Sequence, residues 1–200
     1  MNNLIKDCTG VILAGGENTR MPVLKAFIKV KGIPIIENNL AIIQQLFKET
    51  FIVTNQPEKY SYLGTPLLGD VHDIRGPMTG IFTSLLNSTA PWVFISACDM
   101  PFINKDLINY MHSQRNGFDA VVPSIKGKAE PLFAFYSKKL SSSMEKAVIS
   151  ERRGLNDFLK NKKVKYISAG EIRRFDPRAR SFINLNTPQD ADRHLGLNID

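Results

Sequence analysis

Hydrophobic residues follow two alternating patterns along this chain. Short runs rich in Val, Ile and Phe, typical of buried strands, occur between segments whose apolar residues recur at helical spacing. The pattern predicts strands at residues 9–14, 50–54, 92–97, 119–122 and 131–136, and helices at residues 36–48, 80–86, 104–115 and 155–160. This alternation indicates an α/β domain in which helices connect the strands of a mainly parallel sheet.

Three helix starts carry capping signals. Asn104 and Ser137 are expected N-caps, because their side chains can accept a hydrogen bond from the first turn of the helix that follows. Thr187, Pro188 and Asp190 form a start similar to a capping box, with proline at the first helical position. A final helix should therefore run from Pro188 towards residue 195.

The composition is that of an ordinary folded protein. The chain has 200 residues, of which 43% are hydrophobic and 22% charged, so we expect a single domain spanning residues 1–200. No apolar run approaches the roughly 18–20 residues of a bilayer span, and Lys6 and Asp7 stand where a signal peptide would be apolar. We expect a cytoplasmic protein that does not contact a membrane. Cys8 and Cys98 are not in a CxxC pair and are interpreted as small buried hydrophobes.

Positive charge is concentrated in one region. The chain carries 26 Lys and Arg against 19 Asp and Glu, and residues 138–180 hold 13 of these basic residues with five acidic ones. Solvated helix faces would account for this excess, and a patch for an anionic substrate is the alternative. We expect no nucleic-acid binding, since the sequence has no recognition-helix signature and no basic motif interleaved with aromatic residues.

A glycine-rich loop with two cations follows the first predicted strand. Residues 13–27 read LAGGENTRMPVLKAF. Gly15 and Gly16 allow a sharp turn and a close approach of backbone to ligand, while Arg20 and Lys25 can neutralise charge on a departing pyrophosphate. The segment therefore predicts a polyphosphate site. It is neither a P-loop nor a GxGxxG motif, because the glycine spacing of both is absent.

Acidic and amide side chains supply further candidates. Asp99 comes directly after the strand at 92–97, where an α/β sheet presents ligands, and its carboxylate could hold Mg²⁺ or cap a turn. Asn184 and Asn186 are expected on one face of a strand, where they could orient a phosphate or a metal-bound water, or only stabilise a turn. The three histidines lack a Ser, Cys or acidic partner at useful spacing, which argues against a hydrolase.

Five motifs carry a family resemblance. The glycine-rich loop resembles the signature LAGGxSxRMGxxK of nucleotidyltransferases, and most closely that of molybdenum cofactor guanylyltransferases. In the same order, GPMTG at 76–80 resembles GPLAG, residues 98–102 match CDMPF, residues 130–134 match EPLFA, and NLNTP at 184–188 matches NxNTP. The departures are Asn18 for the commoner Ser, Pro22 for the usual Gly, and Met78 and Thr79 for Leu and Ala. Pro22 fixes φ and removes a donor within the phosphate loop.

The resemblance implies both a fold and an activity. The fold would be a three-layer α/β/α arrangement with a Rossmann-like, mainly parallel sheet of the nucleotidyltransferase type. The activity would be transfer of GMP from GTP to the terminal phosphate of molybdopterin with Mg²⁺, releasing pyrophosphate. Other partners would be proteins that deliver or receive the cofactor. The alternatives are a cytidylyltransferase for the same pterin, a sugar-phosphate nucleotidyltransferase, and a non-catalytic nucleotide-binding adaptor.

The resemblance also assigns roles to individual residues. The catalytic residues would be Arg20, Lys25, Asp99 and Asn186, with Asp99 as the metal ligand. The nucleotide would be held by Leu13, Ala14, Gly15, Gly16, Lys25, Asn55, Asp70, Asp99 and Asn184. Thr54 and Asn55 would lie near the base, and Asp70, favoured over Asp73, would be the acid that contacts ribose or base. LAGG at 13–16 matches the guanylyl branch, whereas the cytidylyl branch tends towards TAAG.

Overall fold

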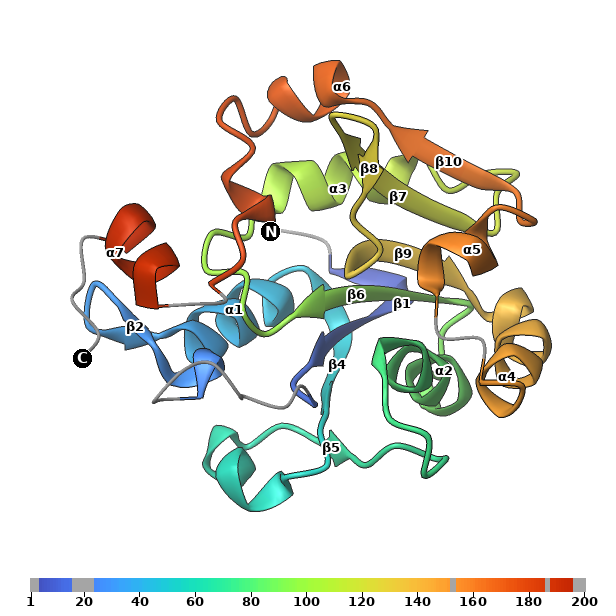
Figure 1. Cartoon of the computed structure of the whole chain (residues 1–200), viewed down its shortest axis with the longest axis horizontal. Coiled ribbons are helices and arrows are strands. Elements are labelled where there is room, and N and C mark those ends of the chain that lie inside the picture. The colour runs from blue at the N-terminus through green and yellow to red at the C-terminus, as the bar shows by residue number, and fades with distance from the viewer. Residues whose placement is uncertain (1–3, 16–23, 152–153, 186–187, 196–200) are drawn as a thin grey trace.

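One large sheet forms the centre of the protein (Figure 1). The computed structural model describes residues 4–15, 24–151, 154–185 and 188–195. Within these ranges the strand order is β10-β7-β9-β6-β1-β4-β5, with β8 paired to β7 and a separate hairpin of β2 and β3. The strands are β1 (Ile5–Leu13), β2 (Lys29–Val30), β3 (Ile33–Pro34), β4 (Phe47–Val53), β5 (Leu67–Leu68), β6 (Trp92–Ala97), β7 (Ala120–Ile125), β8 (Lys128–Ala129), β9 (Phe133–Ser137) and β10 (Val164–Ile167).

Parallel pairing dominates the sheet. β1 pairs in parallel with β4 on one side and β6 on the other, and β5 and β10 also join their neighbours in parallel. β9 is the exception, since it runs antiparallel to both β6 and β7. The carboxyl ends of β1, β4, β5 and β6 therefore meet at one edge, which β9 approaches with its amino end.

Helices cover both faces of the sheet. They are α1 (Ile35–Gln44), α2 (Pro77–Asn87), α3 (Lys105–Ser113), α4 (Ser141–Ile149), α5 (Leu155–Leu159), α6 (Ala169–Arg173) and α7 (Pro188–Leu195). Core side chains of α1, α3 and α6 cluster on one face, and those of α2, α4 and α5 on the other. Figure 1 shows α2 and α4 side by side in the second of these layers.

Alternation along the strands produces the two cores. In β6, Phe94 belongs to the first core, whereas Val93 and Ile95 belong to the second. Phe94 is fully buried and its ring centroid lies 5.6 Å from that of Phe47. Replacing such a residue with Ala would cost about 3–5 kcal/mol of stability. Two cores on opposite faces confirm the expected three-layer α/β/α fold with a mainly parallel sheet.

Several boundaries differ from the sequence-based expectation. The helix expected at 36–48 ends at Gln44, and Phe47 already begins β4. The apolar spacing continues past the helix because Phe47 packs on the sheet over Gly10, where a Cβ atom would overlap it. Asn104 caps α3 by accepting a 2.9 Å hydrogen bond from the Leu107 N–H, as predicted.

The other expected cap serves a different element. The Ser137 hydroxyl accepts from the backbone N–H of Lys139 at 3.3 Å and thereby caps a 3₁₀ turn, Lys138–Leu140, which precedes α4. The expected cap at Thr187 lies outside the described residues.

In the described ranges, no helix combines the length and apolar character needed to cross a membrane.

Candidate active site

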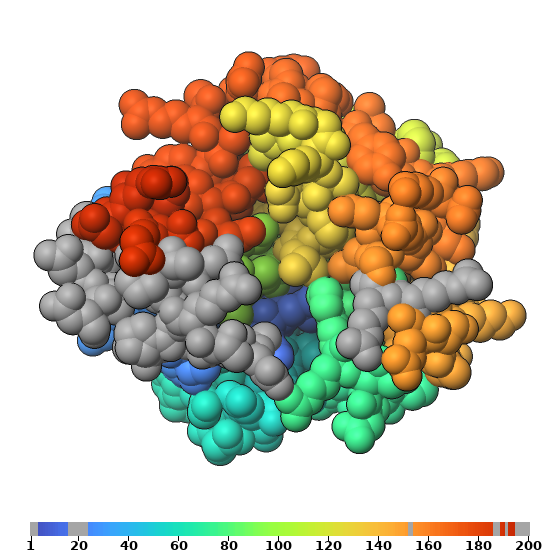
Figure 2. Space-filling view, in the orientation of Figure 1, coloured from blue at the N-terminus to red at the C-terminus, as the bar shows by residue number. Residues whose placement is uncertain are grey.

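A cavity opens at the sheet edge where β1, β4 and β6 end. Its volume is about 470 Å³. Loops that follow parallel strands diverge at this edge, which is why ligands bind there in α/β sheets. In Figure 2 a hollow is visible at the centre of the molecule, with the blue of the β1 region at its base. The cavity is lined by Leu13, Ala14, Gly15, Leu24, Lys25, Ala26, Val53, Thr54, Asn55, Tyr60, Asp70, Arg75, Gly76, Pro77, Gly80, Ala97, Cys98, Asp99 and Leu132.

Lys25 and Asp99 face each other in this cavity. Lys25 begins a 3₁₀ turn, Lys25–Phe27, and Asp99 follows β6 by two residues. The Lys25 Nζ lies 3.5 Å from Asp99 Oδ2, and their side chains are 24% and 19% exposed. Burial raises the pKa of the Asp99 carboxyl above its ordinary value, and Lys25 opposes this rise. This distance is long for an ion pair, and both charged side chains line the cavity that a ligand would occupy.

Asn55 and Asp70 form a second polar pair in the cavity. The Asn55 Nδ2 donates to Asp70 Oδ2 at 2.8 Å, and the Asp70 backbone N–H donates to Asn55 Oδ1 at 2.9 Å. Asp70 Oδ1 is buried and, among the described residues, has no hydrogen-bond partner. Burial also raises the pKa of this carboxyl, while the bond from Asn55 lowers it. The pair therefore presents one unsatisfied acceptor, for which a ligand N–H or O–H would be a partner.

Of the two candidate acids, Asp70 lines the cavity. Asp70 follows β5 by two residues and lines the cavity, whereas Asp73 is not among the lining residues. Thr54 also lines the cavity, but its hydroxyl donates to the Ala14 carbonyl at 3.1 Å. The Ala14 N–H in turn donates to the Val53 carbonyl at 2.8 Å. This amide is committed to the sheet, so phosphate-binding N–H groups would have to come from Gly15 onwards.

The segment containing Asn184 contacts Asp99 through its backbone, but Asn184 is not among the residues that line the cavity. Residues 183–185 have no regular secondary structure, so the expectation of a strand there is wrong. The Leu185 N–H donates to the Asp99 carbonyl at 3.0 Å, which fixes this segment beside Asp99 by a single backbone bond. Asn184 Oδ1 is buried and has no hydrogen-bond partner among the described residues. The predicted site residues Gly16, Arg20 and Asn186 lie outside the described residues.

The structure adds two residues that the sequence did not single out, Tyr60 and Arg75, which line the cavity. Gly76, the first residue of the GPMTG motif, lines it as well. Gly76 precedes α2 with φ at +153°, a conformation that favours glycine, and the Gly-Pro pair was its sequence signal.

The two cysteines differ in their surroundings. Cys8 is buried as expected. Cys98 packs against the same core but is only partly buried as a residue, because it also lines the cavity. Burial of the Cys98 thiol raises its pKa to about 12. This thiol therefore stays protonated near neutral pH and is a poor nucleophile.

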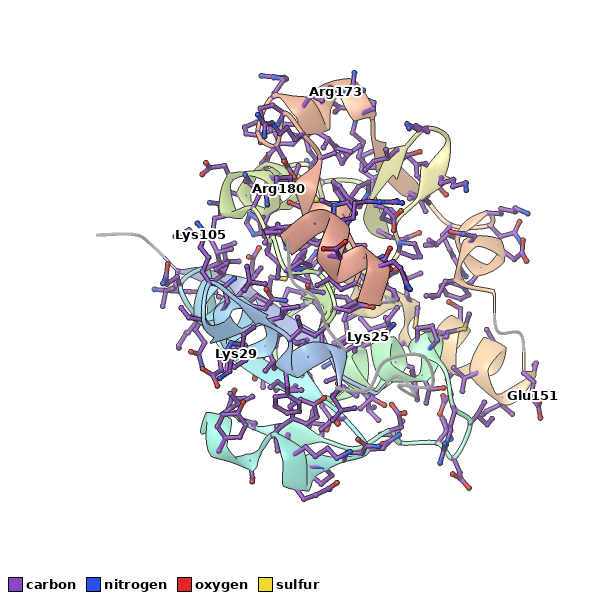
Figure 3. All side chains as sticks on the ribbon, turned by 60° about the vertical axis from the view of Figure 1, so that its left-hand side comes forward. Lys25, Lys29, Lys105, Glu151, Arg173 and Arg180 are labelled. Atoms are coloured by element: carbon purple, nitrogen blue, oxygen red, sulfur yellow. The ribbon has the colours of Figure 1, made fainter. Side chains whose placement is uncertain are left out.

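Several basic residues of the 138–180 region have local partners. The Lys138 ammonium donates to the Ser88 carbonyl, and Lys165 lies 3.5 Å from Glu171. The Arg180 guanidinium carbon lies 3.8 Å from the centroid of the Phe102 ring. None of the described residues from 138 to 180 lines the cavity. Figure 3 shows Arg173 and Arg180 at a distance from Lys25.

The sequence was compared with known protein families and with individual relatives, and both comparisons find nucleotidyltransferases. Residues 10–166 match the family model of the MobA-like NTP transferase domain. A probable molybdenum cofactor guanylyltransferase of Peptoclostridium acidaminophilum is 38% identical over 190 residues, covering 91% of this chain and 86% of the relative. One of Natranaerobius thermophilus is 36% identical over 197 residues, covering 94% and 96%.

A solved structure extends the likeness to three dimensions. The crystal structure of molybdopterin-guanine dinucleotide biosynthesis protein A from Archaeoglobus fulgidus matches with a TM-score of 0.83 at 25% identity, covering 94% of this chain and 97% of that one. The described fold and the order of the sequence motifs are thus both those of one family. The chain belongs to the MobA-like NTP transferase family.

Proposed function

We propose that this protein transfers GMP from GTP to the terminal phosphate of molybdopterin, releasing pyrophosphate and forming molybdopterin guanine dinucleotide. One observation carries the proposal: Lys25, Asp99 and the Asn55–Asp70 pair all line a single cavity at the carboxyl ends of parallel strands. The relatives named as molybdenum cofactor guanylyltransferases support the same reaction. We also propose that residues 1–200 act as one domain, since Leu185 bonds directly to Asp99 from beyond the matched family region.

The chemistry requires positioning and charge more than a covalent nucleophile. An oxygen of the molybdopterin phosphate attacks the α-phosphorus of GTP as the bond to pyrophosphate breaks. No general base is needed, because a phosphate monoester is already anionic near neutral pH. We assign Lys25 to the triphosphate, where its ammonium stabilises the negative charge that develops on the leaving group. Arg20 is proposed to share this role.

A divalent metal fits the oxygen groups near Asp99. The Asp99 carboxylate lines the cavity, and Asn184 Oδ1 is a buried oxygen without a partner among the described residues. Mg²⁺ takes one or two protein oxygens and completes its shell with phosphates and water, so a small donor set suits it. The described residues contain no group of three or more His, Cys, Asp or Glu that could hold a metal unaided.

We therefore propose Mg²⁺ as the metal, Asp99 as its principal ligand, and Asn184 and Asn186 as side chains that hold it or its waters. When bound, the ion would neutralise part of the triphosphate charge. The Lys25 Nζ lies 3.5 Å from Asp99 Oδ2, so its charge would help to hold that carboxylate in place.

The Asn55–Asp70 pair favours guanine as the base. Guanine presents adjacent N1–H and N2–H donors, and the unsatisfied Asp70 Oδ1 is an acceptor. A cytosine at this position would present ring acceptors to a buried acceptor, which leaves polar groups unpaired and costs affinity. We propose that Asp70 selects guanine in this way and that Asn55 fixes its orientation.

Competition among nucleotides tests the proposal. Purified protein would be incubated with molybdopterin, Mg²⁺ and each of the four nucleoside triphosphates, and both pyrophosphate and the pterin dinucleotide would be quantified by mass spectrometry. We expect product with GTP and far less with CTP. Preference for CTP would indicate a cytidylyltransferase, and nucleotide binding without product would indicate the adaptor.

A further inference from the structure

In the strand order, the strands that carry the nucleotide residues lie on one side of the sheet edge that holds the cavity, and β9 and β7 lie on the other. The cavity residues assigned above to the nucleotide lie at the end of β1 or in the segments that follow β1, β4, β5 and β6. Beyond β6 lies β9 and then β7. If the proposed function is correct, the acceptor phosphate must reach the α-phosphorus from the side opposite the leaving pyrophosphate. The segment between β8 and β9 bonds to Ala97 through Leu132, which lines the cavity on the side where no nucleotide contact has been assigned.

Glu130 lies in this segment, two residues before the cavity residue Leu132. β6 and β9 pair in antiparallel register, with Ser96 opposite Phe133. The Ala97 N–H then donates to the Leu132 carbonyl at 2.9 Å, which extends the pairing by one residue on each strand. Beyond this bond the pairing ends, because the Phe133 N–H donates to the Glu130 carbonyl and closes a turn over residues 130–133. Leu132 lines the cavity, and Glu130 lies just outside its lining.

The backbone around Glu130 is firmly held. The Glu130 N–H donates to the Pro123 carbonyl at 2.9 Å, and the Glu130 carbonyl accepts from the Phe133 N–H at 3.1 Å. The hydroxyl of Tyr136, a fully buried residue, donates to the Pro131 carbonyl at 2.7 Å. These hydrogen bonds fix the backbone on both sides of Glu130 and therefore the position of its Cα atom, as a recognition residue requires.

The Glu130 carboxylate has no structural partner in the described part of the chain. The residue is half-buried, and no hydrogen bond or ion pair to its carboxylate occurs among the described residues, although Lys128 lies close enough to lower its pKa. Burial raises the pKa of this carboxyl, so the protein does not compensate the charge fully. A partly desolvated carboxylate at the rim of a cavity is best satisfied by donors from a ligand.

The surface view agrees with a role at the rim of the site. In Figure 2 the yellow segment that includes the β8–β9 connection descends to the central hollow and forms part of its wall. Leu185, in the C-terminal part of the chain, also bonds to the Asp99 carbonyl. A ligand that extends from Asp99 on this side would pass the β8–β9 segment.

We propose that Glu130 is a specificity residue for the acceptor substrate, and that its carboxylate accepts hydrogen bonds from the N–H groups of the pterin ring. The 2-amino-4-oxopyrimidine part of a pterin offers an amino group and a ring N–H side by side, a pair that one carboxylate can receive bidentately. A carboxylate would repel the acceptor phosphate, so Glu130 contacts the ring and leaves the phosphate to the cations.

The test separates acceptor recognition from the other functions of the site. We would compare Glu130→Gln and Glu130→Asp with the control Glu151→Gln, which changes an exposed residue that Figure 3 places at the margin, away from Lys25. The measurements are the KM for molybdopterin, the KM for GTP, the Mg²⁺ dependence and the melting temperature. Equilibrium binding of molybdopterin in the presence of a non-reactive GTP analogue would be measured in parallel.

For Glu130→Gln we expect the KM and Kd for molybdopterin to rise about 10- to 100-fold, as for loss of charge-assisted hydrogen bonds. The values for GTP and Mg²⁺ should change less than about twofold, Glu130→Asp should restore part of the affinity, and the control should match the parent protein.

Two results would overturn the inference while leaving the proposed function intact. One is an unchanged Kd and KM for molybdopterin in Glu130→Gln in a parent protein that does transfer GMP. The other is an equal loss of GTP affinity or an altered Mg²⁺ dependence, which would place Glu130 with the nucleotide or metal. If the parent protein makes no product, the proposed function fails, and the binding measurement alone still decides whether Glu130 holds the pterin.

Discussion

Replacing Asp99 with Asn separates the chemical role of this residue from a structural one. The change keeps the size of the side chain and removes its negative charge. In the structure that charge makes one contact with Lys25, at 3.5 Å between partly exposed side chains. A pair of this kind contributes at most about 1 kcal/mol, and neutralising a carboxyl whose pKa is raised by burial offsets part of that loss. For a chain of this size the melting temperature should therefore shift by no more than about 2–4 °C.

Turnover should respond far more strongly to Asp99→Asn. A hard cation prefers a charged oxygen ligand, and an amide oxygen holds it less well. Because the charge on the leaving pyrophosphate is greatest in the transition state, we expect kcat to fall about 10²- to 10³-fold while the Kd for GTP rises much less. Raising Mg²⁺ should restore part of the activity. The assay is a Mg²⁺ titration of kcat, GTP affinity and melting temperature.

Either of two outcomes would refute the reasoning about Asp99. Unaltered turnover with unaltered Mg²⁺ dependence would exclude it from the metal site. A collapse of the melting temperature would show that its main role is to stabilise the turn after β6, as the capping alternative holds.

Three further predictions concern other residues. Lys25→Ala should lower kcat about 10²- to 10³-fold at saturating GTP without unfolding the protein, and near-normal turnover would remove Lys25 from the triphosphate site. Asn55→Ala removes both side-chain bonds that orient Asp70, so the Kd for GTP should rise about 10-fold, and unchanged selectivity of GTP over CTP in a binding competition would contradict its role. Hydrogen bonds from Ser168 hold the pKa of Glu171 at about 2. Because the folded state lowers this pKa, its contribution to stability is present above about pH 4.5 and is lost as pH falls towards 2. Denaturant unfolding of Glu171→Gln should show a difference from the parent that shrinks over that range.

The layered fold could be predicted because the central strands are continuous apolar runs between helical segments. The same signal misplaced the end of α1, since Phe47 continues the apolar spacing of Ile43 although it packs from the sheet. Short elements such as β5 (Leu67–Leu68) were missed because two residues carry no periodicity. They matter nonetheless, because β5 is the strand that brings Asp70 to the cavity.

The candidate site was predictable where a motif adjoins a strand and less so where distant segments meet. Lys25 and Asp99 each lie close to a central strand, and both line the cavity. The pairing of Asn55 with Asp70 joins two loops, so neither its hydrogen bonds nor the distinction from Asp73 could be derived from spacing. Glu130 was part of a motif, but its position at the rim of the cavity follows from the antiparallel pairing of β6 and β9, which brings the neighbouring Leu132 into the cavity lining.

The fate of each phosphate of GTP tests the central claim most directly. GTP labelled at either the α- or the γ-phosphate would be incubated with the protein, Mg²⁺ and molybdopterin, and the label would be followed into separated products. Transfer of a nucleotidyl group predicts that the α-label appears in the pterin dinucleotide and the γ-label in pyrophosphate, with excess unlabelled CTP having little effect. A γ-label in the pterin product, an α-label that remains in nucleotide alone, or strong suppression by CTP would contradict the account.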